Sequence, residues 1–407
     1  MKAELPSYVF SRSTRVVIEI LQDILAVKYF TYEEEVSDIL IWNWKLGILL
    51  NRIQCFGASC TFGFLTYNSL ILFHSNRSSE ASAVKVLIYN KIVYSIGLGN
   101  DEEGSWHVSK YEPMMPRFQL DFPTFHPDTR TKLSMRTEPA PTVSASNLAT
   151  FVPLPIARVL QLSMIVRQGN VWGVAKFGYY YVFINKEVLL KHLALKPHST
   201  EPVEFFTMLP WEAWGEHTTR WFRTASAFPS WIYRAYGTRF ICTGLFDDER
   251  ESNSACHLSI LDFHQPTTRR FSSPHLSMWN SKEARRHIDL NAPGEDLEHA
   301  FSALKSKQDV MEEDAAFVDT IDEDVPSLTP FNRKTLVTRL PYRIVTRFQP
   351  VPKRSWWMID NKHVISMPVS VILKSSASAH LLNGWCNRQG GELYSWILKR
   401  LYSQSIK

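Results

Sequence analysis

The sequence predicts an all-β fold in which small antiparallel sheets recur along the chain, with only small helical insertions. Aromatic residues make up 13% of the 407 residues, and aromatic side chains favour the half-buried surface of a pleated sheet. Short β-branched and aromatic runs are separated by polar turns, which is typical of successive strands. Strand pairs of similar design return after about 40 to 50 residues, a spacing typical of the blades of a β-propeller.

The first repeat contains four predicted strands separated by polar or charged segments. The strands are expected at 16–21, 24–30, 39–44 and 48–53. Trp42 and Trp44 lie in the third of them, and Gly47 provides the turn before the fourth. Because each run is short and bounded by turn residues, the segment is predicted to form one small antiparallel sheet.

Similar strand pairs are expected at 69–98, 239–271 and 355–369. Tyr89 takes the place that Trp42 has in the first repeat, and Asp262 lies in the corresponding strand of a later one. Residues 105–230 fit the repeat poorly. The recurrence nevertheless predicts one multi-blade, propeller-like domain.

Two segments depart from this pattern. Residues 183–195 are predicted to form a short helix with leucines on one side. Residues 281–330 are polar and acidic, so we expect a flexible insertion there with a helical piece near 297–306. The predicted division is a tail at 1–15, a single propeller-like domain at 16–370, and an extension with a short helix at 371–407.

Composition argues against two classes of partner. The net charge is +5, and the Lys and Arg residues are scattered rather than gathered into the patch that a nucleic-acid binder needs. No apolar run approaches the roughly 20 residues that span a bilayer. The N-terminal residues lack the pattern of a signal peptide. We therefore expect an intracellular protein, cytoplasmic or nuclear, that binds neither nucleic acid nor membrane.

No set of residues in the sequence makes a convincing catalytic or metal site. Cys55 and Cys60 lack the second pair of ligands that structural zinc needs, so we expect them to be small buried side chains. His217 has charged neighbours, but no Ser or Cys lies in a nucleophile motif. The sequence predicts no catalytic residue, no cofactor, no metal and no enzymatic activity.

The segment PWEAWGEHTTRWF at 210–222 is unusually rich in tryptophan. Its indoles belong to Trp211, Trp214 and Trp221. They could form an exposed platform that stacks ligands, or they could anchor the segment on a sheet. Because Trp is mostly buried in proteins, the structural alternative is favoured. Glu212, Glu216 and Arg220 are then expected to pair with one another or to face water.

The segment ILIWNWKLGILL resembles the closing strands of a WD-repeat blade, in which an aromatic–Asp pair ends one strand. Asn43 stands where those repeats carry Asp. More broadly, the chain resembles the C-terminal region of a large family of fungal F-box proteins. The segments that carry this resemblance are 42–50, 62–73, 210–222, 236–241, 258–263, 340–345 and 358–367. In order and spacing they cover most of residues 15–370.

The resemblance implies a non-enzymatic protein-interaction domain, the substrate-recognition part of a ubiquitin ligase receptor. Members of that family carry an N-terminal F-box that binds the Skp-type adaptor of cullin-RING ligases. Here only Leu5 and Pro6 match the start of an F-box, so adaptor binding is expected only if an F-box lies upstream. The alternatives are a propeller-fold enzyme acting on sugars or peptides and a scaffold unrelated to ubiquitination. The structural landmarks are Trp42, Trp44, Trp211, Trp214, Trp221 and Asp262.

Overall fold

The structure, a computed structural model, places most of the predicted strands. It describes residues 3–4, 15–30, 36–56, 59–77, 82–93, 106–107, 112–126, 128–136, 159–168, 176–194, 207–224, 235–243, 255–264, 316–321, 323–324, 326–331, 334–347, 351–352, 354–359 and 364–368.

Four larger sheets, named I to IV, follow one another in chain order, except that the last strand of sheet II, β14, comes from the chain between the third and fourth strands of sheet III. Sheet I contains β2 (Arg15–Leu21), β3 (Ile24–Phe30), β4 (Val36–Asn43) and β5 (Ile48–Phe56). Sheet II contains β6 (Cys60–Thr66), β7 (Ser69–Arg77), β8 (Ser82–Asn90), β10 (Phe118–Asp121) and, at its edge, the parallel strand β14 (Thr207–Leu209). Each begins with consecutive strands that pair antiparallel with their neighbours.

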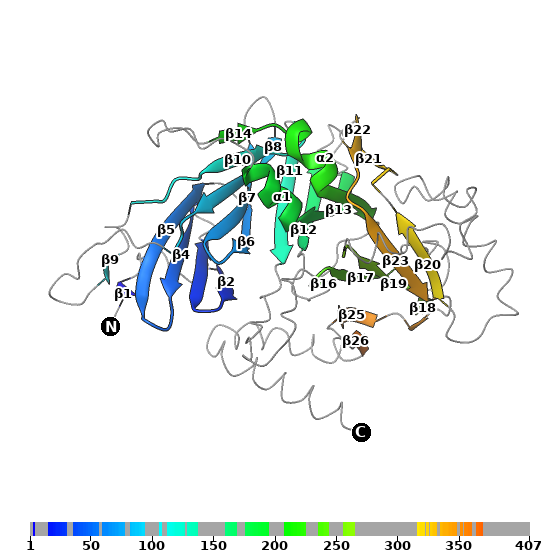
Figure 1. The fold of residues 1–407 in the computed structure, drawn as a ribbon, viewed down its shortest axis with the longest axis horizontal. Helices are drawn as coiled ribbons and strands as arrows, with labels where there is room; N and C mark the ends of the chain where they lie inside the picture. The colour runs from blue at the N-terminus through cyan, green and yellow to red at the C-terminus, as the bar shows by residue number, and fades with distance from the viewer. Residues whose placement is uncertain are drawn as a thin grey trace, which may run out of the picture.

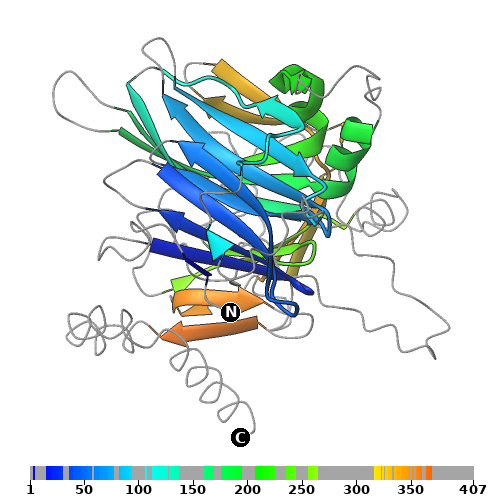
Figure 2. The same cartoon turned by 90° about the vertical axis from the view of Figure 1, so that its left-hand side faces the viewer.

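Sheets III and IV use the same antiparallel design. Sheet III contains β11 (Thr129–Arg136), β12 (Val159–Gln168), β13 (Lys176–Asn185) and β15 (Thr219–Thr224). Sheet IV contains β16 (Ala235–Tyr236), β17 (Arg239–Thr243), β19 (Leu258–Asp262), β23 (Tyr342–Arg347) and β20 (Ala316–Ile321) in spatial order. The four sheets stand side by side around an arc (Figure 1), and Figure 2 views that arc from the sheet I end.

The remaining elements are short. Two-stranded pairs are β1 (Ala3–Glu4) with β9 (Trp106–His107), β18 (Ala255–Cys256) with β24 (Val351–Pro352), β21 (Ser327–Phe331) with β22 (Lys334–Thr338), and β25 (Arg354–Ile359) with β26 (Val364–Pro368). The described helices are α1 (Lys186–Ala194) and α2 (Trp211–Thr218), which lie between the third and fourth strands of sheet III. The predicted all-β fold is therefore confirmed.

Each pair of neighbouring sheets encloses a hydrophobic core. Sheets I and II share one core, sheets II and III a second, and sheets III and IV a third. Strand β13 shows how the sequence supports this: Tyr180 and Val182 face sheet II, whereas Tyr181 and Phe183 face sheet IV. Successive side chains of a strand point to opposite faces, so a strand covered on both sides needs an almost continuous apolar run.

The third strand of each sheet ends in Asn or Asp: these residues are Asn43, Asn90, Asn185 and Asp262. Where the side chain caps the following turn, its Oδ1 accepts a backbone N–H. Asn43 Oδ1 accepts the backbone N–H of Leu46 at 3.0 Å, and Asp262 Oδ1 accepts the backbone N–H of His264 at 3.0 Å. Trp42 and Tyr89 both precede these terminal residues, so the predicted equivalence of Trp42 and Tyr89 is confirmed. The repeat also extends to sheet III, within the segment that had fitted it poorly.

Other sequence predictions have mixed outcomes. The predicted helix at 183–195 is α1, in which Leu189 and Leu193 are buried. Of the flexible insertion expected at 281–330, residues 281–315 lie outside the described part of the chain; the end of the segment contains β20, paired with β23, and most of β21, paired with β22. The strands AFVDTI and SLTPF are short and lie among acidic residues, so the composition of the segment did not reveal them. The predicted helices near 297–306 and in 371–407 lie outside the described residues.

Candidate functional site

The tryptophan-rich segment 210–222 is built into the core. Pro210, with φ −67°, precedes α2, and the chain passes directly from α2 into β15. The rings of Trp211, Trp214 and Trp221 surround Phe122, with centroids 5.5, 5.6 and 5.6 Å from its ring. All three indoles are buried. The segment is therefore an anchor between sheets II and III rather than an exposed platform.

Gly215 is required for this packing. A Cβ atom added there would collide with the ring of Trp211. On helix propensity alone, Gly215→Ala would stabilise α2 by about 0.5 to 1 kcal/mol. We expect the opposite sign, a loss of about 1 to 3 kcal/mol in the free energy of unfolding, because the added methyl group would overpack the core. Chemical denaturation measures this change, with the exposed Glu212→Ala as a control; a stabilised Gly215→Ala variant would contradict the packing.

Arg220 departs from the sequence expectation, because it does not face water and its guanidinium donates to the segment 327–340. It is fully buried, and its guanidinium lies 5.2 Å from the ring centroid of Tyr342. Its Nε donates to the carbonyl oxygen of Leu340 at 2.7 Å. Its Nη1 donates to Ser327 Oγ at 2.7 Å and to the carbonyl oxygen of Thr338 at 3.1 Å. Burial lowers the pKa of Arg220 to about 10, so the group remains charged at neutral pH.

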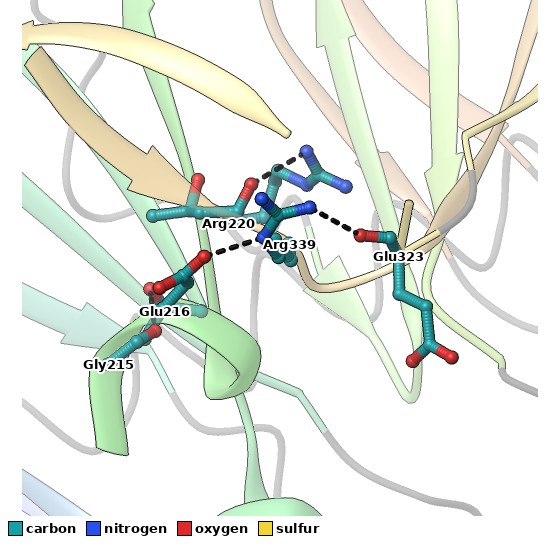
Figure 3. Close-up of polar contacts among 7 residues, drawn as sticks. Gly215, Glu216, Arg220, Glu323 and Arg339 are labelled. Atoms are coloured by element: carbon teal, nitrogen blue, oxygen red, sulfur yellow. Dashed lines mark hydrogen bonds and ion pairs between the residues drawn. The ribbon is translucent and has the colours of Figure 1, made fainter. Parts of the chain in front are cut away.

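Glu216 pairs with a different arginine. Its Oε1 lies 2.5 Å from Nε of Arg339, and its carbonyl oxygen accepts the backbone N–H of Arg339 at 2.7 Å. Arg339 also donates to the carbonyl oxygen of Glu323 (Figure 3). With Arg220, these contacts join α2 and β15 to the segment around β21 and β22. His217 is exposed while Glu216 and Arg220 bind elsewhere, so the three do not form an acid–base group.

Two further landmarks also have structural roles. Trp42 is half-buried and packs with Leu40 and Leu49 on sheet I. Asp262 Oδ1 accepts the hydroxyl of Thr238 at 2.8 Å, which fixes the short turn between β16 and β17 to the end of β19. Both positions therefore hold neighbouring strands of one sheet together.

Trp44 differs from the other landmarks because it points outward from the turn between β4 and β5. It lies on what we call the turn surface, which also contains residues from the β2–β3 and β6–β7 turns. The turn surface consists of Gln22, Asp23, Trp44, Leu46 and Tyr67. The exposed fractions of its large side chains are 49% for Trp44, 64% for Leu46 and 39% for Tyr67.

Hydrogen bonds converge on the β2–β3 turn and hold these side chains in place. Trp44 Nε1 donates to the carbonyl oxygen of Gln22 at 2.9 Å, and its backbone N–H donates to that of Asp23 at 3.0 Å. The hydroxyl of Tyr67 donates to Asp23 Oδ1 at 2.9 Å, and Asn43 Nδ2 donates to Asp23 Oδ2 at 3.1 Å. Asp23 thus ties the first turns of sheets I and II together.

Electrostatics and backbone geometry support the same arrangement. The hydrogen bond to Asp23, with smaller contributions from burial and the Asp23 charge, raises the pKa of Tyr67, so its hydroxyl stays a donor at neutral pH. Lys45 Nζ lies 5.8 Å from the Trp44 ring centroid. Gly47 closes the β4–β5 turn at φ 68°, a conformation that most other residues adopt only with strain. The turn surface is therefore partly apolar and exposed, and hydrogen bonds hold its side chains in place.

Sequence reasoning had named Trp44 on this surface but missed the others. Asp23, Leu46 and Tyr67 are ordinary turn residues, and nothing in the sequence brings the three turns together. The available signal was the recurrence itself, since repeated meanders place corresponding turns at the same end of successive sheets.

Comparison with known proteins adds no assignment to this geometry. No protein-family description matches the chain. No curated protein matches it either. The described residues bring no three His, Cys, Asp or Glu side chains together as candidate metal ligands. Of the helices that the structure describes, neither has the length and apolar character needed to cross a bilayer.

Proposed function

We propose that this chain is a non-enzymatic protein-interaction domain of the β-propeller type. Sheets I to IV act as its blades. The support is that the sheets follow in chain order, that each pair of neighbours shares a core, and that each third strand ends in Asn or Asp. A rigid stack of blades holds its turns in fixed positions, and such turns can supply a wide binding face.

The observation that carries the interaction role is the turn surface. Exposed Trp and Tyr side chains are enriched at the energetic centres of protein interfaces. Here the hydrogen bonds of Trp44 and Tyr67 to the β2–β3 turn fix both rings before a partner arrives. Binding then costs little side-chain entropy. Leu46 adds apolar area beside them, and Lys45 adds a positive charge at the rim.

The specific proposal is substrate recognition for an F-box-type ubiquitin ligase. Its support is the resemblance of the ordered sequence landmarks to the C-terminal region of fungal F-box proteins. In such a receptor, the turn surface would bind the protein to be ubiquitinated, and an F-box, if one lies upstream of these residues, would bind the Skp-type adaptor. The two parts of the proposal are tested separately.

Replacing Trp44 and Tyr67 together with Ala should abolish partner binding without unfolding the domain. Two contact residues worth about 2 kcal/mol each should together weaken Kd by roughly a thousandfold. The stability loss should be about 1 to 3 kcal/mol, since the variant gives up the hydrogen bonds of Trp44 Nε1 and of the Tyr67 hydroxyl, each worth about 0.5 to 1.5 kcal/mol. The measurement is quantitative affinity purification from the native cell, with a melting curve of each purified variant.

Phe177→Ala is the matched control, because Phe177 is an aromatic residue of sheet III that is 48% exposed. Proteins that are lost with the double variant but kept by Phe177→Ala are the candidate partners. If the double variant retains every co-purifying protein, the turn surface is not the binding site. If the complete gene product retains partners but never the Skp-type adaptor or a cullin, the ligase role is wrong and the interaction role stands.

A further inference from the structure

Cys55 and Cys60 lie at the junction between sheets I and II. Cys55 is near the end of β5, the last strand of sheet I, and Cys60 is the first residue of β6, the first strand of sheet II. Their sulfur atoms are 3.1 Å apart. The two side chains are 5% and 7% exposed, and both belong to the core between the sheets. They are therefore a contacting thiol pair rather than two separate apolar fillers.

Charged and polar groups surround this pair inside an otherwise apolar core. Lys28 of β3 is buried, and its Nζ donates to the carbonyl oxygen of Cys60 at 2.5 Å. Cys55 Sγ donates to the carbonyl oxygen of Ser37 at 3.6 Å. His74 of β7 pairs with Cys60 across sheet II, on the same face. Burying an ammonium group is costly unless an anion or strong acceptors offset it, and a thiolate beside Lys28 is such an anion.

The titration of the pair agrees with this geometry. A hydrogen bond from Cys55, helped by the charge of Lys28, lowers the pKa of Cys60 to about 5 despite its burial. The same hydrogen bond and burial raise the pKa of Cys55. Burial, and to a smaller extent the charge on the two cysteines, raises the pKa of Tyr89 on β8. The two opposite shifts favour a proton on Cys55 and a thiolate on Cys60, beside Lys28.

We propose that Cys55 and Cys60 are a redox site that a peroxide converts to a disulfide, cross-linking sheets I and II. The Cys60 thiolate attacks one peroxide oxygen, the O–O bond breaks, and the second oxygen leaves as hydroxide, which takes up a proton to become water. Cys55 then attacks the resulting sulfenic sulfur, the S–O bond breaks, and the hydroxide released takes the Cys55 proton. Two thiols and one peroxide give one disulfide and two waters.

The fold favours this step over further oxidation of Cys60. A disulfide needs its sulfur atoms at about 2.05 Å, so Cys55 has only about 1 Å to move. Because the resolving thiol already touches the sulfenic sulfur, the second step precedes attack by another peroxide. A thiol reductant reverses the reaction by exchange. The cross-link closes a short loop and fixes the sheet junction at the end of β6 that is opposite the turn surface.

Mass measurement on the full chain tests this directly. The reduced protein is treated with hydrogen peroxide, alkylated in denaturant and digested. Trypsin leaves both cysteines in the peptide 53–77, whose mass should fall by two hydrogens, and cleavage after Phe56 should give two fragments joined only by the disulfide. Cys242, which is also buried and also donates to a carbonyl oxygen at 3.6 Å, should remain alkylatable and serves as the matched control.

Single variants separate the roles of the residues. Cys55→Ser should leave a Cys60 sulfenic acid that dimedone traps, whereas Cys60→Ser should leave Cys55 almost unreactive. Lys28→Gln should move the pH at which the oxidation rate halves upward, toward the ordinary thiol value of about 8.5, with His74→Gln and Tyr89→Phe moving it less. This shift in the pH profile would not follow from a purely structural role of Lys28.

The result that overturns the proposal needs no variant. If peroxide oxidises Cys242 of the folded parent chain as fast as it links Cys55 to Cys60, the pair has no special reactivity. Linkage that forms only after denaturation, or conversion of Cys60 to the sulfinic acid without linkage, overturns it as well. Because these readouts come from the parent protein, a variant that fails to fold leaves the test intact.

Discussion

Trp221→Ala should lower the free energy of unfolding by about 3 to 5 kcal/mol, the usual cost of removing a buried large aromatic side chain. Trp221 is 0% exposed. Its ring lies 5.2 Å from that of Phe331, 5.6 Å from Phe122, 5.8 Å from Trp211 and 6.0 Å from Tyr180, measured between centroids. These contacts come from sheet III, α2, the β21–β22 pair and the chain after β10, so one truncation loosens several elements. Urea denaturation with intrinsic fluorescence measures the loss.

Trp44→Ala is the matched control, because it removes the same side chain from an exposed position. Its cost should be about 1 kcal/mol, because the variant loses one hydrogen bond, from Nε1 to the carbonyl oxygen of Gln22, and little buried surface. Trp221→Phe keeps a ring in the core and should fall between the two. A Trp221→Ala protein that unfolds at the same urea concentration as the parent, with the same slope, would contradict the anchoring role of the segment.

The strands of sheet I, and β7 and β8 of sheet II, could be predicted from sequence because each is bounded by clear turn residues. The strand predicted at 24–30 matches β3, and Gly47 lies in the expected turn. Sheet III was harder, because α1 and α2 interrupt it before its fourth strand. A helical insertion breaks the spacing of a repeat without altering the sheet, so a period search fails there although Asn185 still marks the end of β13.

The candidate site could be predicted only in part, because its residues meet through tertiary contacts. Trp42 and Trp44 are one residue apart, yet one is half-buried and the other exposed, since the strand ends at Asn43 between them. The hydrogen bond from Tyr67 to Asp23 joins two sheets across 44 positions of sequence. Local pattern does not reveal such pairings.

The sequence also did not reveal the groups that bind the buried guanidinium of Arg220. Arg220 has Glu216 four positions before it, which suggested a local ion pair. In the structure Arg220 lies in a strand and reaches Leu340, while Glu216 lies in a helix and reaches Arg339. The change from helix to strand at Thr219 turns the two side chains toward different neighbours.

Arg220→Met should destabilise the domain by at least about 3 kcal/mol. Methionine fills part of the volume but donates no hydrogen bond, so the carbonyl oxygens of Leu340 and Thr338 lose a charged donor inside the core. Each buried polar group left unsatisfied costs roughly 1 to 3 kcal/mol. Thermal and urea denaturation measure the loss. The effect should be largest for the joint between β15 and the β21–β22 pair, which amide hydrogen exchange at 327–340 reports.

Arg339→Met provides the comparison, because Arg339 and Glu216 form an ion pair in which both side chains are partly exposed. Exposed pairs contribute about 0 to 1 kcal/mol, so this variant should stay close to the parent. Arg220→Lys keeps the charge but not the planar fork of donors, and it should recover only part of the loss. If Arg220→Met is no less stable than Arg339→Met, the buried guanidinium does not hold the joint, and packing of the surrounding rings joins β15 to the β21–β22 pair.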